Sequence, residues 1–103
     1  MVSVAITGNQ NNWQPFKDYV ECWRVSSDQT RSITGIADGA DGLPRTIINV
    51  GTGSQDLTIA NQNASSSAFN RIITGTGADM TVTPDNGVFM RYDSTTSRWR
   101  VLP

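Results

Sequence analysis

Seven short apolar runs set the strongest limit on how this 103-residue chain can fold. Each is followed within two residues by glycine, proline, asparagine or aspartate, and they recur at roughly ten-residue intervals, a spacing typical of strands joined by turns. The intervening sequence is rich in threonine, serine and asparagine, which are poor helix formers. The runs occupy residues 33–36, 46–50, 57–59, 69–74, 80–82, 87–92 and 98–102. We therefore predict an all-β fold of short antiparallel strands.

The first 32 residues carry two further strand patterns. Apolar and small polar residues alternate over residues 2–6, which predicts a half-buried strand. Residues 19–25 also alternate and are predicted as a strand, although the aromatic residues from 16 to 23 fit helical spacing behind Pro15 as well. Residues 26–32 are wholly polar and are predicted to form a linker or a long turn.

Two further features predict how the strands connect. Asp85-Asn86-Gly87 lies between two runs, and Asn-Gly accepts the positive φ angles that a type I′ hairpin turn requires. Residues 47–59 are echoed in shortened form by residues 72–82, with a Gly-Thr-Gly turn in each copy. Such an echo predicts stacked two-strand units, neither of which buries its apolar face alone.

Composition excludes several classes of function. The net charge is −1, whereas nucleic-acid binding needs clustered lysine and arginine. Histidine is absent, which removes a common general base and metal ligand, so we predict no catalytic residue, no metal and no cofactor. Asp38 and Asp41 lie in a glycine-rich segment that favours a turn over a calcium site. No apolar run approaches the roughly 20 residues of a membrane span, and neither membrane insertion nor a secretory signal is expected.

The size of the apolar runs bears on assembly. Each holds only a few large apolar residues, fewer than a lone domain of this length would be expected to bury. Another copy of the chain is the simplest source of the missing hydrophobic contacts, so we expect an obligate homo-oligomer packed around a symmetry axis. The residues expected in the core or between subunits are Ile47, Leu57, Ile59, Ile72, Met80, Val82, Val88 and Trp99.

Two segments of the chain resemble a known family. Residues 57–72 contain a Leu-Thr-Ile strand and a serine-rich turn that ends in Asn-Arg-Ile, and residues 92–102 contain Tyr-Asp followed by Arg-Trp. In this order the motifs resemble the β-structured C-terminal modules of bacteriophage tail-fibre, spike and head-fibre proteins. The resemblance covers residues 33–102. It implies an intertwined homotrimer with a β-prism or β-sandwich-like module, made in the host cytoplasm and used in the virion.

The resemblance also implies a division of roles along the chain. Residues 33–103 would form the trimeric module, and residues 1–32 would form a small segment that attaches to the capsid or another virion component. Because few residues precede the module, we expect a homotrimeric head-fibre or capsid decoration protein that is not an enzyme. The alternative is a tail-fibre tip that binds a carbohydrate, such as a host-surface glycan, or another host receptor.

Two groups of residues are candidates for binding. Aromatic rings stack on sugars, and arginine side chains bind carboxylates or hydroxyl groups. The ligand surface expected of a fibre tip consists of Tyr92, Arg98, Trp99 and Arg100. The alternation of this segment favours a structural interpretation, in which Trp99 faces the core. The residues expected to anchor the protein to the virion are Trp13, Phe16, Tyr19 and Trp23.

Overall fold

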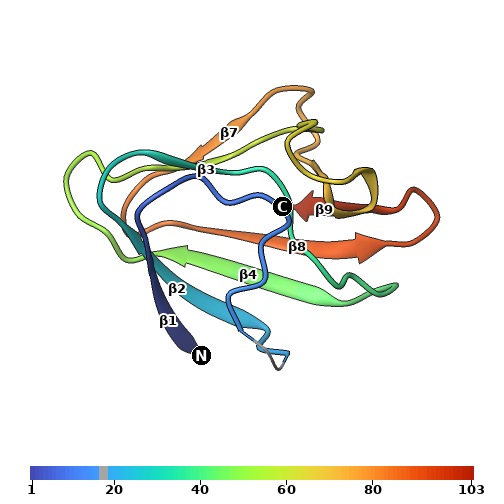
Figure 1. The fold of residues 1–103 in the computed structure, drawn as a ribbon, viewed down its shortest axis with the longest axis horizontal. Coiled ribbons are helices and arrows are strands. Elements are labelled where there is room, and N and C mark those ends of the chain that lie inside the picture. The colour runs from blue at the N-terminus through green and yellow to red at the C-terminus, as the bar shows by residue number, and fades with distance from the viewer. Residues whose placement is uncertain (17–18) are drawn as a thin grey trace.

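The short apolar runs and polar turns form strands in the computed structural model, which describes residues 1–16 and 19–103 (Figure 1). In this part of the chain the regular elements are nine strands and one turn of 3-10 helix. They are β1 (Val2–Ile6), β2 (Cys22–Ser27), β3 (Arg31–Ile33), β4 (Pro44–Asn49), β5 (Leu57–Ile59), η1 (Ala68–Asn70), β6 (Ile72–Ile73), β7 (Met80–Val82), β8 (Gly87–Asp93) and β9 (Arg98–Leu102). The all-β prediction is confirmed, and each of the predicted runs overlaps a strand.

The polar segment after the second predicted strand is more ordered than expected. β2 continues to Ser27, and β3 begins at Arg31, so the linker predicted over residues 26–32 is reduced to a short turn. Side chains of β2 alternate in burial, and Ser27 is buried in phase with Trp23 and Val25. The alternation of inward and outward positions therefore predicts the strand better than the polarity of its residues does. A small hydroxyl side chain such as that of Ser27 fits the inward side of a strand.

The N-terminal half winds through parallel strands in a β-solenoid-like arrangement (Figure 1). β1, β2 and β4 are parallel neighbours, with Val2 opposite Trp23 and Trp23 opposite Ile47. β3 and β5 are also parallel, and an isolated bridge joins Gln10 to Ile33 beside them. Parallel neighbours require a crossover, which the chain between these strands supplies. The predicted antiparallel pairing is wrong for this half of the chain.

The C-terminal half reverses direction and adds antiparallel strands. β8 lies between β4 and β9 and is antiparallel to both, while β7 is antiparallel to β5. The predicted hairpin is wrong, because β7 and β8 belong to different sheets. The chain turns a corner instead: Asp85 takes the positive φ, at 71°, and the Asn86 amide donates to the Thr83 carbonyl oxygen at 3.1 Å. Proline before a positive-φ residue suits this turn.

The internal echo does not stack as predicted. β5 and β7 are the matching strands of the two copies, but they run antiparallel, with Leu57 opposite Val82. Ile72 of β6 pairs with Trp99 of β9 and not with β4. In the parallel half the paired residues are instead separated by unequal lengths of chain, from 21 residues between Val2 and Trp23 to 26 between Arg31 and Leu57. Sequence similarity therefore identified two strands that are neighbours without giving their direction.

The large apolar side chains form one core cluster within the single chain. Of the residues predicted for the core or for subunit contacts, Met80 is partly buried against this cluster, and the others are buried. The buried residues are Ile47, Leu57, Ile59, Ile72, Val82, Val88 and Trp99. One chain thus buries the residues that we expected to need a second copy. The sequence argument for a homo-oligomer loses this premise, and the homotrimer stays a prediction.

Residues 1–32 share their sheet and core with the rest of the chain. β1 and β2 lie in the same six-stranded sheet as β4, β8, β9 and β6. Trp13 and Trp23 belong to the same core cluster as Ile47. The boundary predicted at residue 32 therefore does not coincide with a break in the sheet, and an attachment role for this segment stays a prediction.

Candidate functional site

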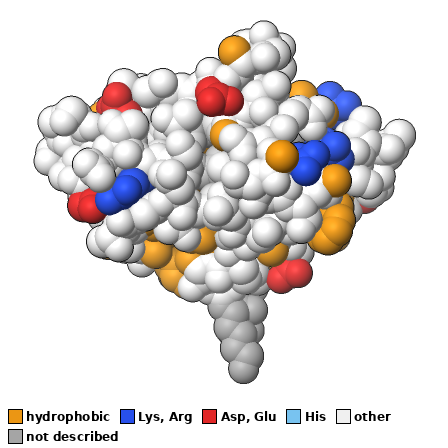
Figure 2. Space-filling model, turned by 45° about the horizontal axis from the view of Figure 1, so that its top comes forward, with side chains coloured by type: hydrophobic (Ala, Val, Ile, Leu, Met, Phe, Trp, Pro, Cys, Tyr) orange, Lys and Arg blue, Asp and Glu red, His pale blue; other side chains and the backbone are white. Residues whose placement is uncertain are grey.

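A cavity of about 320 Å³ opens where the segment before β2 meets the segment before β4. Its aromatic and aliphatic lining includes Phe16, Tyr19, Trp23 and Leu43, and its charged lining residues are Asp38 and Arg45. Figure 2 shows one face of the molecule, on which hydrophobic side chains gather in the lower part while charged side chains stand singly or in small groups. A cavity of this volume, mainly apolar with a few polar groups, has the size and chemistry of a small-ligand site.

Trp23 forms the rigid aromatic wall of the cavity. Its backbone lies between β1 and β4, opposite Val2 on one side and Ile47 on the other, so both neighbouring strands hold it. The Trp13 ring meets the Trp23 ring edge-on, with centroids 4.9 Å apart, and the Phe16 ring does so at 5.9 Å. Edge-to-face contacts of this kind are favourable and fix ring orientation.

Arg45 places a positive charge beside these rings. Its side chain is 3 % exposed, and its guanidinium carbon lies 4.2 Å from the centroid of the Trp23 ring, 4.9 Å from Tyr19 and 5.7 Å from Trp99. One guanidinium nitrogen, Nη1, donates to the Val20 carbonyl oxygen. Burial lowers the pKa of the Arg45 guanidinium, but an arginine side chain stays charged at neutral pH. Cation-π contacts thus stabilise a buried charge.

No ion pair within residues 1–16 and 19–103 neutralises this charge. The two that the structure shows there join Arg31 to Asp28 and Arg100 to Asp93. In addition, the indole Nε1 of Trp23 and the Nε of Arg45 are buried without a hydrogen-bond partner among the described residues. A buried donor without an acceptor costs about 1–3 kcal/mol. The wall of the cavity therefore contains a charge and two donors whose polar interactions are incomplete.

Tyr19 and Asp38 are exposed members of the lining, as are Gln14 and Ala40. Tyr19 is 51 % exposed, and its hydroxyl donates to the Pro44 carbonyl oxygen at 2.6 Å. Partial burial raises the pKa of this hydroxyl, and the charge of Arg45 opposes the shift. Asp38 holds a left-handed backbone conformation, with φ of 61°, in the turn region that the sequence predicted. These two residues give the cavity a polar rim above an apolar floor.

The residues predicted to anchor the protein to the virion are gathered at this cavity. Phe16, Tyr19 and Trp23 line it, and Trp13 packs behind Trp23. Trp13 and Trp23 are 5 % and 2 % exposed, so they do not project from the surface as anchors that would insert into a partner. The sequence therefore identified these four aromatic residues as a group, and the structure shows that they surround a cavity and do not form a protruding patch.

The other predicted site, the ligand surface at the C-terminal end, is not assembled. Trp99 is fully buried, and its indole Nε1 donates to the Ile36 carbonyl oxygen at 2.8 Å. Tyr92 is also buried, packs edge-on against Trp99 at 5.2 Å, and donates its hydroxyl to the Phe69 carbonyl oxygen. The prediction that these two rings form a ligand surface is wrong, because both satisfy core packing and backbone acceptors.

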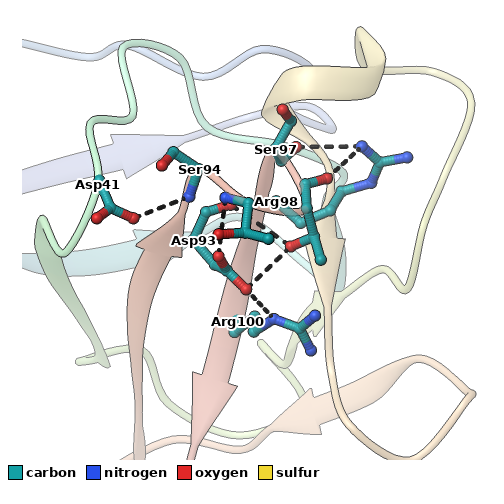
Figure 3. Close-up of polar contacts among 8 residues, drawn as sticks. Asp41, Asp93, Ser94, Ser97, Arg98 and Arg100 are labelled. Atoms are coloured by element: carbon teal, nitrogen blue, oxygen red, sulfur yellow. Dashed lines mark hydrogen bonds and ion pairs between the residues drawn. The ribbon is translucent and has the colours of Figure 1, made fainter.

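The two arginines of that predicted surface are engaged with neighbouring loops (Figure 3). Arg100 Nε lies 2.8 Å from Asp93 Oδ2 across the β8–β9 turn, and Arg98 Nε donates to the side-chain oxygen of Gln62 at 2.6 Å. The hydrogen bond from Arg100 lowers the pKa of the Asp93 carboxyl group. Asp41 accepts the Ser94 amide at 3.0 Å in the same region. This cluster ties turns together and lies outside the lining of the cavity.

Sequence reasoning missed Arg45, although a signal was present. Arg45, Ile47 and Asn49 are spaced two residues apart in β4, and all three are buried. An arginine in phase with buried residues is unusual, because arginine is almost never fully buried unless it is paired. The prediction began that strand at residue 46 and therefore did not include Arg45.

Among the described residues, no group of three or more histidine, cysteine, aspartate or glutamate side chains could hold a metal ion. The same residues include no helix that is long and apolar enough to cross a membrane. No protein-family model, curated protein or solved structure gives a significant match to this chain. The resemblance to phage appendage modules therefore rests on the sequence motifs alone.

Proposed function

We propose that the chain is a non-catalytic carbohydrate-binding module of a bacteriophage appendage, and that the aromatic cavity is its binding site. The observation that carries the proposal is the convergence of Phe16, Tyr19 and Trp23 on one cavity with a charged residue in its wall. Sugars present C–H faces that pack on aromatic rings and hydroxyl groups that bond to charged and polar side chains. The lining supplies both kinds of surface within a volume suited to one or two sugar units.

The composition of the lining favours binding over hydrolysis. Glycoside hydrolysis in most families uses a pair of carboxyl groups that flank the scissile bond. Asp38 is the sole carboxylate among the described residues that line the cavity. We therefore assign the cavity to recognition of a glycan and not to its cleavage.

The proposal is tested by removing aromatic surface from the rim of the cavity. In Phe16→Ala and Tyr19→Ala, affinity for a bound glycan should fall about tenfold, because each change removes a stacking surface worth about 1 kcal/mol or more. Binding is measured by ligand-observed NMR and by titration calorimetry against a panel of neutral and acidic glycans. The matched control is Phe69→Ala, since Phe69 is 60 % exposed and lies outside the cavity lining.

The control separates a site from a generally sticky surface. Phe69→Ala should bind as the parent does. All three variants should remain folded at the temperature of the binding measurement, although Phe16→Ala should melt below the parent because Phe16 packs against the core and Trp23. Equal affinity in the parent and in both rim variants would show that the glycan binds elsewhere. Failure of the parent to bind any glycan on the panel would refute the carbohydrate-binding proposal.

A second candidate is the homotrimeric head-fibre or capsid decoration role that the resemblance implies. The observation that favours it is the position of β1 at an edge of the six-stranded sheet, where it pairs with β2 on one side. The free side of an edge strand offers unpaired backbone groups to another chain. Light scattering coupled to size exclusion would give three times the chain mass of 11.2 kDa for a trimer. A monomer would remove this candidate.

A further inference from the structure

Within the described part of the chain, no carboxylate makes an ion pair with Arg45, and the exposed Glu21 carboxylate acts on its charge only from beyond ion-pair distance. Arg45 lines the cavity and is 3 % exposed, and neither of the ion pairs in the described part of the chain includes it. Its neighbours on β4 alternate between buried and half-buried positions, so the backbone holds the side chain inward. Three aromatic rings surround the guanidinium without neutralising it. An anionic group in the cavity would complete its electrostatic environment.

The remaining polar groups indicate how such an anion would be oriented. The Nε atom of Arg45 and the indole Nε1 of Trp23 are buried donors without acceptors among the described residues, and both side chains line the cavity. Asp38, the exposed carboxylate of the lining, would repel a second carboxylate placed beside it. A ligand with one acidic group would therefore direct that group toward Arg45 and present neutral hydroxyl groups to Asp38.

We infer that the cavity selects a sugar that carries a carboxylate, such as a hexuronic or sialic acid, and that Arg45 is the residue that recognises the carboxylate. This inference rests on the proposed carbohydrate-binding function and adds the class of sugar. The aromatic surfaces of Phe16, Tyr19 and Trp23 hold the ring of the sugar, and the guanidinium selects its charge. An uncharged sugar would place no carboxylate in direct contact with Arg45 and would bind more weakly.

The test compares ligands that differ in charge alone. The probes are the methyl glycosides of glucuronic acid, galacturonic acid and N-acetylneuraminic acid, each beside its uncharged methyl ester. Titration calorimetry gives the affinities, and ¹⁵N spectra follow the side-chain resonances of Arg45 Nε and Trp23 Nε1. We expect at least one acid to bind about tenfold more tightly than its ester, which is the loss typical of one hydrogen bond to a charged group. The Arg45 resonance should shift with the acid.

Variants connect the preference to Arg45. In Arg45→Gln the acid and its ester should bind equally, and in Arg45→Lys part of the preference should remain because the charge is kept without the planar fork. The matched control is Arg24→Gln on β2, since Arg24 is exposed and adjacent to Trp23 in sequence but alternates to the opposite side of the strand. This control should keep the parent's preference.

The possible outcomes separate the inference from the function on which it rests. Equal binding of acids and esters by the parent would overturn the acidic-sugar inference and leave carbohydrate binding intact. Binding of no sugar would refute both. If blocked glutamate, acetyl-Glu-amide, bound as tightly as the best acidic sugar, the cavity would recognise an acidic protein side chain and the inference would fall. The comparison of acids with their esters uses the parent protein alone. It therefore decides the inference even if Arg45→Gln fails to fold.

Discussion

Asn49 offers the sharpest test of how the two sheets are held together. It ends β4 and is fully buried, yet all its side-chain polar atoms are bonded. Its amide nitrogen donates to the Gln55 carbonyl oxygen at 2.9 Å and to the Val82 carbonyl oxygen at 2.8 Å, while its side-chain oxygen accepts the Gly51 amide at 2.9 Å. Asn49 thus joins β4, in the larger sheet, to β7, in the smaller one.

Replacing Asn49 by alanine should strongly destabilise the fold. The change leaves three backbone groups without this partner, and each buried one costs about 1–3 kcal/mol, so we expect a loss of about 3–5 kcal/mol. Domains of this size have total stabilities of about 5–15 kcal/mol, and the loss is therefore a large share. At about 4–8 °C per kcal/mol, the melting temperature should fall by about 12–40 °C. Urea unfolding and differential scanning calorimetry measure both quantities.

The matched control for Asn49 is a second asparagine at the same corner. Asn86 is exposed, and its side chain donates to Thr83 Oγ1 at 2.8 Å and to the Pro84 carbonyl oxygen at 3.3 Å. Because water can replace these bonds, Asn86→Ala should change stability by no more than about 0.5 kcal/mol. If Asn49→Ala unfolded at the same denaturant concentration as Asn86→Ala, the claim that Asn49 ties the sheets would be refuted.

Two further predictions concern backbone packing and pH. A Cβ atom added at Gly35 would clash with Ser66 Oγ and lie 2.6 Å from the Asn70 carbonyl oxygen, so Gly35→Ala should lower the melting temperature sharply. Gly8→Ala, with open space at that position, should leave it nearly unchanged. Since Arg100 lowers the pKa of Asp93, the ionised pair stabilises the fold at neutral pH and loses this effect as pH falls through the folded-state pKa. Arg100→Gln should therefore melt below the parent at pH 7 and converge with it in acid, and a constant difference across pH would contradict the assignment.

The sequence was sufficient to predict most strands but not their partners. Period-two alternation identifies a strand wherever one face is buried, which is why the prediction over residues 2–6 matches β1. Pairing depends on contacts between distant residues, such as Val2 with Trp23, and no local pattern specifies them. The Asp85-Asn86-Gly87 segment illustrates the limit. Its residues suit a hairpin, yet β8 pairs with β4 and β7 pairs with β5.

The site was predicted only in part for the same reason. Clustered aromatic residues between positions 13 and 23 were recognisable as too many for an idle segment, but their concave arrangement depends on a segment more than twenty residues away. Arg45 belongs to that segment, and its burial becomes apparent only when β4 is aligned beside β2. Because β4 begins at Pro44, its inward-facing residues are Arg45, Ile47 and Asn49, and two of these three are polar. Asn49 is fully satisfied by backbone groups and is structural, whereas Arg45 retains an unpaired donor beside a cavity. Both residues are buried, so burial does not distinguish their roles. A buried residue whose hydrogen-bonding groups all have partners supports the fold, whereas one that retains a donor without a partner is available to a ligand.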